Sequence, residues 1–212
     1  ADSCLLLLLA WEVIALAAFF AATADDHEPA VREAGWIYLV ATHTGTLALL
    51  ALVAVLRAAT GRFAWSAIPP GNEWLRAVVF LLALVGFGFK AGLVPVHFWL
   101  PGAHANAPSH VSALLSGVML KMGVYGFLRV TQLLPEPPAW WGGLVLVVAL
   151  LTALTGILLA LREGDLKRLL AYSSVENLGI VFLGIGLALL GRAQHRPEWV
   201  ALGLAAAVLH VV

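Results

Sequence analysis

The sequence predicts an all-α protein, a polytopic bundle of transmembrane helices, from three observations. Of its 212 residues, 62% are hydrophobic and only 11% are charged, and the mean hydropathy is +0.96. The apolar residues gather in runs of about 20, which is the length that a helix needs to cross a bilayer. A few charged side chains interrupt these runs well away from their ends. This pattern is typical of a membrane protein that uses buried charge.

Composition also excludes several classes of site. The net charge is zero, so the chain has no basic face for nucleic acid. The single cysteine, Cys4, excludes a disulfide framework and a cysteine-ligated cluster or zinc site. The sequence contains neither a glycine-rich phosphate loop nor a dinucleotide-binding fingerprint. We therefore expect no metal and no cofactor in this chain, and we interpret the acidic run DDHEPAVRE as a solvated loop.

The apolar runs predict about seven spans within a single transmembrane domain over residues 1–212. The last run ends with the sequence itself, which favours a piece of a longer membrane protein as the interpretation. Loops rich in Pro, Gly, Trp or charge separate the runs, as is expected of connections at a membrane interface. The predicted spans cover residues 3–23, 36–56, 75–90, 108–130, 140–161, 169–190 and 198 onward.

The third predicted helix is expected to break between Lys90 and Trp99. Gly92 and Pro95 follow Lys90 directly, and a proline removes a backbone donor and clashes with the preceding turn. We expect a short second piece over residues 93–104. Irregular backbone at membrane depth is tolerated only where it is buried in protein or lines a wet cavity. This stretch is therefore a candidate site.

Glu12 and Lys90 are buried charges of opposite sign. Glu12 lies about ten residues from either end of its run, so its short side chain cannot reach the interface. Lys90 lies at the helix break, and Gly86 and Gly88 before it would let another helix approach closely. Because each is otherwise an uncompensated charge, we expect the two side chains to form an ion pair.

Lys121 is the third charge within an apolar run. It lies eight residues before Arg129, or about 12 Å along a helix axis, and Arg129 is the natural interfacial anchor. Ala113, Gly117 and Tyr125 share one i, i+4 row with it, which suggests a packed, protein-facing surface. A lysine at this depth near a carboxylate can gain and lose a proton close to neutral pH.

Histidines complete the set of candidate relay groups, because imidazole exchanges protons near neutral pH. His43 lies within the second run and His210 within the last, while His97, His104 and His110 flank the expected break. For these three, proton relay and a structural role, in which they bond carbonyls freed by the break, are both open.

Two long motifs give the sequence a family resemblance. The run FGFKAGLVPVHFWLPGAHANAPSHVSALLSGVMLKMGVYGFLR resembles the signature of the antiporter-like, proton-translocating subunits. These subunits occur in respiratory complex I, in Mrp sodium/proton antiporters and in membrane-bound group 4 hydrogenases. The run GDLKRLLAYSSVENLGIVFLGIGLALL resembles the next motif of that family. HFWLP, APSHVSALLSG and AYSSVENLGI are most similar to the hydrogenase-4 component B and formate hydrogenlyase type, whereas Gly102 departs from the charged residue that many members carry there.

The resemblance implies a fold and a set of roles. The fold would be part of an inverted-repeat antiporter-like bundle. Glu12 would pair with Lys90, and Lys121 would carry the proton onward. Independently of the resemblance, the imidazole chemistry of His43, His97 and His210 makes them candidate members of the relay.

Two functions follow as expectations. The first is a proton-translocating subunit of a redox-driven complex, which has no catalytic centre of its own and works with other membrane subunits of a hydrogenase or complex I-like assembly. The alternative is an Mrp-type cation/proton antiporter subunit without a redox partner, for which sodium would be a transported ion. Either would be a multi-pass protein of a prokaryotic inner or plasma membrane.

Overall fold

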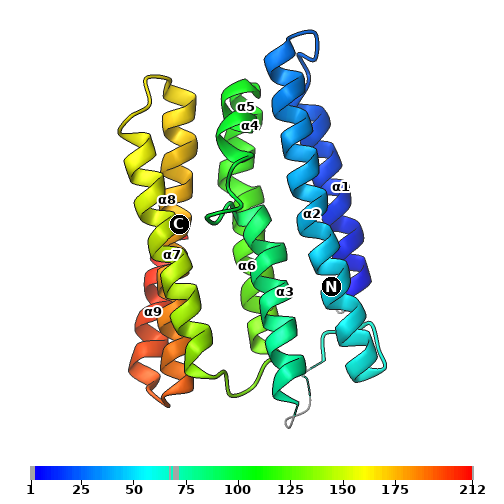
Figure 1. Cartoon of the computed structure of the whole chain (residues 1–212), viewed down its shortest axis with the longest axis vertical. Coiled ribbons are helices and arrows are strands. Elements are labelled where there is room, and N and C mark those ends of the chain that lie inside the picture. The colour runs from blue at the N-terminus through cyan, green and yellow to red at the C-terminus, as the bar shows by residue number, and fades with distance from the viewer. Residues whose placement is uncertain (1–2, 67, 69–71, 212) are drawn as a thin grey trace. The chain divides into compact units, whose positions relative to one another are not determined.

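The computed structural model of the chain describes residues 3–66, 68 and 72–211. Apart from a single antiparallel bridge between Ser3 and Ala64, the regular elements of this part of the chain are helices (Figure 1). In chain order they are α1 (Cys4–Ala22), α2 (Pro29–Thr60), α3 (Glu73–Ala91), α4 (Leu100–Asn106), α5 (Ser109–Leu114), the π-helical turn η1 (Leu115–Met119), α6 (Leu120–Gln132), α7 (Ala139–Ala160), α8 (Leu166–Ala193) and α9 (Pro197–Val211).

The chain divides into two compact units. Unit 1 comprises residues 1–90 and 102–135, and unit 2 comprises residues 91–101 and 136–212. Unit 1 therefore contains α1, α2, most of α3, most of α4, and the α5–η1–α6 segment. Unit 2 contains the irregular stretch after α3 together with α7, α8 and α9.

Small residues let the helices of unit 1 approach closely. Helices α1 and α2 lie side by side and antiparallel (Figure 1). Helices α2 and α3 meet at Gly45 and Gly86, where a side chain on Gly45 would come within 2.8 Å of Phe89 and 3.2 Å of the Gly86 carbonyl. This contact confirms that Gly86 permits the approach of another helix, which brings the end of α3, and Lys90 with it, toward α2.

Unit 2 is built on close contacts between consecutive helices. Helix α8 packs against both α7 and α9. Gly142 of α7 faces the backbone of α8, since an added side chain there would lie 2.7 Å from the Leu190 nitrogen. Thr152 of α7 is fully buried in this packing.

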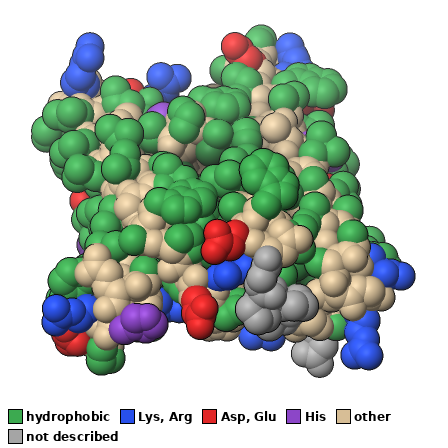
Figure 2. Space-filling model, turned by 60° about the horizontal axis from the view of Figure 1, so that its bottom comes forward, with side chains coloured by type: hydrophobic (Ala, Val, Ile, Leu, Met, Phe, Trp, Pro, Cys, Tyr) green, Lys and Arg blue, Asp and Glu red, His purple; other side chains and the backbone are tan. Residues whose placement is uncertain are grey.

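Six helical segments of the described chain are long and apolar enough to cross a membrane, and α9 is a shorter apolar helix. Hydrophobic side chains cover much of the face shown in Figure 2. On α7, residues such as Leu150, Leu154 and Leu158 are exposed in one stripe at helical spacing. Such a stripe is stable only against lipid or another apolar partner, so the all-α transmembrane class that the sequence predicts is confirmed.

Three predicted boundaries differ from the structure. Helix α2 begins at Pro29 and not near residue 36, because Pro29 occupies the first turn and the polar turns after it extend the helix beyond its apolar run. The short piece after the break begins at Leu100, not Leu93. The fourth predicted helix is interrupted by η1, whose wider turn the apolar pattern did not reveal.

Candidate functional site

Glu12 lies on the side of α1 that faces α2, and α2 supplies both of its partners. The Thr46 hydroxyl donates a short hydrogen bond to Oε1 of Glu12. The Nε2 atom of His43 lies 3.6 Å from Oε2. The Glu12 side chain is 29% exposed, so its charge is partly shielded from the surroundings and is compensated by α2.

The hydrogen bonding of His43 determines which of its ring nitrogens carries a hydrogen and which one faces Glu12. Nδ1 of His43 lies 2.9 Å from the Leu39 carbonyl, which can only accept, so Nδ1 carries a hydrogen. In the neutral ring, Nε2 then presents a lone pair toward the carboxylate of Glu12. His43 thus presents a hydrogen-bond acceptor, Nε2, on the side of its ring that faces Glu12.

Lys90 lies in the last turn of α3 and is only 3% exposed. Its ammonium makes no hydrogen bond to any residue that the structure describes. Instead, Nζ lies 5.5 Å from the centroid of the Trp11 ring and 5.9 Å from that of the Tyr38 ring. A cation in the last helical turn is also favoured by the negative end of the helix dipole.

The Lys90 ammonium makes no hydrogen bond to Glu12 or to another described residue, and the expected approach of the two charges as an ion pair stays a prediction. Thr46 and His43 engage both carboxylate oxygens from α2, while the ammonium lies against aromatic rings. Unit 1 thus carries Glu12, His43 and Lys90 on α1, α2 and α3, with Glu12 in contact with α2 and Lys90 against two aromatic rings.

The predicted helix break is confirmed. Gly92, just past the end of α3, has a φ of +75°, a left-handed conformation that suits glycine, and turns occupy the chain up to Trp99. The Val94–Pro95 peptide bond is cis. The Val94 amide donates to the Thr152 hydroxyl at 3.0 Å, and that hydroxyl donates to the Val148 carbonyl at 2.7 Å. Thr152 therefore satisfies a donor that the break frees, although no motif in the sequence marks this residue.

The histidines around the break have different surroundings. His104 is 2% exposed, and its Nδ1 atom lies 2.7 Å from the Ser112 hydroxyl, which ties α4 to α5. His97 is half-buried in the turn after α3, and His110 is exposed at the start of α5. A structural role thus fits His104, although its partner is a hydroxyl and not a freed carbonyl.

Lys121 is half-buried on α6, directly after η1. The packed row predicted around it is wrong for this chain, because Ala113, Gly117 and Tyr125 are all exposed. The row crosses the π turn η1, whose extra residue shifts the register between α5 and α6.

His210 on α9 is exposed and belongs to unit 2. Its Nε2 atom lies 2.8 Å from Oδ1 of Asn177 on α8. Asn177 was not among the predicted residues, although its place beside Glu176 in an apolar helix is a signal of the same kind as that of Glu12.

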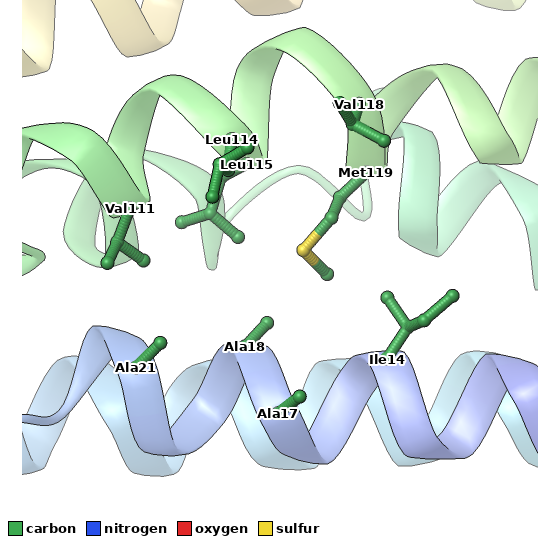
Figure 3. Close-up of a pocket in the computed structure, with 9 residues that line it drawn as sticks. All are labelled: Ile14, Ala17, Ala18, Ala21, Val111, Leu114, Leu115, Val118 and Met119. Atoms are coloured by element: carbon green, nitrogen blue, oxygen red, sulfur yellow. The ribbon is translucent and has the colours of Figure 1, made fainter.

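An apolar pocket lies in unit 1 between α1 and the α5–η1 segment (Figure 3). Its volume is about 330 Å³, and every side chain that lines it is a hydrocarbon or a thioether. Nothing in this lining can hold or pass a proton. Among the described residues, no three His, Cys, Asp or Glu side chains gather closely enough to bind a metal ion.

Comparison with known proteins decides the family. The family described as NADH:quinone oxidoreductase/Mrp antiporter, TM, matches residues 1–195. The chain belongs to this family. It is thereby a multi-pass membrane protein, and the antiporter-like fold that the two motifs imply is confirmed.

Individual relatives agree with this assignment. Hydrogenase-4 component B of Escherichia coli is 39% identical over 219 residues, which cover 100% of this chain and 32% of that protein. An uncharacterized protein of Mycobacterium tuberculosis is 45% identical over 206 residues, covering 97% of this chain and 32% of its own length. A chain in the structure of the Mrp complex from Dietzia sp. superposes with a TM-score of 0.81 at 30% identity, over 100% of this chain and 23% of that one. This chain therefore spans about a third of the length of the curated relatives that it matches.

Proposed function

We propose that this chain is part of a proton-translocating membrane subunit that works in a redox-driven complex, of the hydrogenase or NADH:quinone oxidoreductase type. The observation that carries the proposal is the set of Glu12, His43 and Lys90 on three neighbouring membrane-length helices of unit 1. Ionisable groups within spanning helices are costly, and they mark ion and proton pathways.

In the proposed mechanism the groups act in sequence. His43 and Glu12 share one proton across the 3.6 Å between Nε2 and Oε2. A change in the charge of this pair alters the field at Lys90, whose ammonium makes no hydrogen bond among the described residues. The Lys90 amine can then release or take up a proton. Lys121 of α6 receives it. His97 and His210, which belong to unit 2, are further candidate relay groups.

The alternative is an Mrp-type cation/proton antiporter subunit without a redox partner. One observation favours it: the superposition on a chain of the Mrp complex extends over the whole of this chain. The two functions differ in what drives the proton, since one needs electron transfer and the other needs an opposing cation gradient.

Inside-out vesicles containing the full-length protein with its native partner subunits distinguish the two. Internal acidification is followed with a pH-sensitive dye, first with hydrogen, formate or NADH as electron donor and then with an imposed sodium gradient alone. The proposal predicts acidification with an electron donor and none with sodium. Acidification with sodium alone would establish the antiporter instead.

A Lys90→Met variant of the same vesicles tests the site. It should lose acidification while electron transfer to an artificial acceptor continues, because methionine keeps the length of the side chain without its proton. Unchanged acidification in this variant would overturn the proposed relay.

A further inference from the structure

We propose that Trp11 and Tyr38 form a cation–π cage that holds the Lys90 ammonium inside unit 1. The two rings supply the stabilisation that a paired carboxylate would otherwise supply. The starting point is an energetic difficulty. Lys90 is 3% exposed, and its ammonium has no hydrogen-bond partner among the described residues. A buried charge without compensation is strongly unfavourable, so some other interaction must stabilise it.

The two aromatic rings supply that interaction. An ammonium within about 6 Å of a ring centroid is attracted by the negative face of the ring, most strongly where water is excluded. Nζ of Lys90 lies 5.5 Å from the Trp11 centroid and 5.9 Å from the Tyr38 centroid. The rings are 3% and 1% exposed. They belong to α1 and α2, whereas the lysine belongs to α3, so three helices meet at one cation.

Both rings are held in place by other contacts. The Tyr38 hydroxyl donates to the Ala15 carbonyl at 3.2 Å, which fixes the ring of α2 against α1. Trp11 meets Phe87 edge-on, with centroids 5.5 Å apart and an interplanar angle of 80°. Phe87 lies one turn before Lys90 on α3. The cage is therefore built into the packing of the three helices.

The cage also explains why the Glu12 carboxylate can bond to side chains of α2 and not to Lys90. Trp11 and Glu12 are consecutive on α1, so their side chains leave the helix in directions about 100° apart. Glu12 meets Thr46 and His43, while Trp11 meets Lys90. In the proposed function, Trp11 and Tyr38 are positioning residues, which keep the cation at a defined place while no carboxylate pairs with it.

A double-mutant cycle on the purified full-length protein tests the contact without any transport assay. Trp11 is replaced by tryptophan analogues with one, two and more ring fluorines, which keep the shape but weaken the negative face. The series is made with Lys90 and again with Lys90→Met. We expect the melting temperature to fall with each added fluorine when residue 90 is lysine, and to stay constant when it is methionine.

Two outcomes would overturn the cage. An equal fall in both backgrounds would mean that Trp11 contributes packing alone, and no fall in either would mean that the ring does not hold the cation. A Tyr38→Phe variant, which keeps the ring and loses the hydroxyl, should retain the dependence on fluorination. Since melting does not depend on proton movement, failure of the cage and failure of the proposed function are distinguishable. If the cycle shows coupling and vesicles still do not acidify, only the proposed function is wrong.

Discussion

Two side chains of α2 contact the Glu12 carboxylate. One of them, Thr46, can be replaced by a side chain of the same shape that lacks the hydroxyl. Thr46 donates to the carboxylate, and the same hydroxyl lies 3.2 Å from the Thr42 carbonyl of its own helix. Because a hydrogen bond to a charged group is stronger than one between neutral groups, Thr46 is the main anchor of this carboxylate.

Thr46→Val should therefore destabilise the protein by about 1.5–3 kcal/mol, the usual contribution of a hydrogen bond to a charged group. Thermal unfolding of the purified full-length protein measures the effect. Thr44→Val is the matched control, because Thr44 is exposed and its hydroxyl donates to the Val40 carbonyl of its own helix. Equal melting temperatures for the two variants would show that Thr46 does not anchor Glu12.

At the scale of elements, the break after α3 depends on a helix distant in sequence. The Thr152 hydroxyl of α7 accepts a hydrogen bond from the Val94 amide, and Thr152 is fully buried. A buried amide that loses its acceptor carries the full cost of its desolvation, about 1–3 kcal/mol.

Thr152→Val should thus loosen the stretch between α3 and α4 while leaving α7 helical. Hydrogen–deuterium exchange of the full-length protein should become faster in residues 92–99. Thr155→Val, one turn away and only half-buried, serves as the control and should leave that exchange unchanged. If Thr152→Val leaves exchange at 92–99 as slow as in the wild type, the amide does not depend on this hydroxyl.

The elements were predictable from the sequence to different degrees. Runs such as that of α1 are apolar over a full span, so its bounds lie within a residue of those predicted. The break was predictable because Gly92 and Pro95 oppose a helix locally. The partners of Glu12 and Lys90 were not, because they depend on which way each side chain leaves its helix. Thr152 and η1 could not be predicted either, because a single threonine and one extra helical residue hardly change an apolar pattern.

At the scale of the whole molecule, the chain forms two compact units, with Glu12, His43 and Lys90 in the first and the His210–Asn177 contact in the second. It spans about a third of its curated relatives. Tests of the proposed transport are therefore made on the full-length protein.

The central claim is that lysine amines in the membrane carry protons, and Lys121→Arg tests it most directly. Arginine keeps the positive charge but does not release its proton in a protein. The chain has one lysine besides Lys90 and Lys121, which is Lys167 in the first turn of α8. Lys167→Arg is therefore the matched control.

The measurement is proton translocation per electron in vesicles that contain the assembled complex, with electron transfer to an artificial acceptor recorded in parallel. Lys121→Arg should abolish translocation and keep most of the electron transfer, whereas Lys167→Arg should resemble the wild type. Translocation at the wild-type rate in Lys121→Arg would show that Lys121 is only a fixed positive charge, and would contradict the proposed relay.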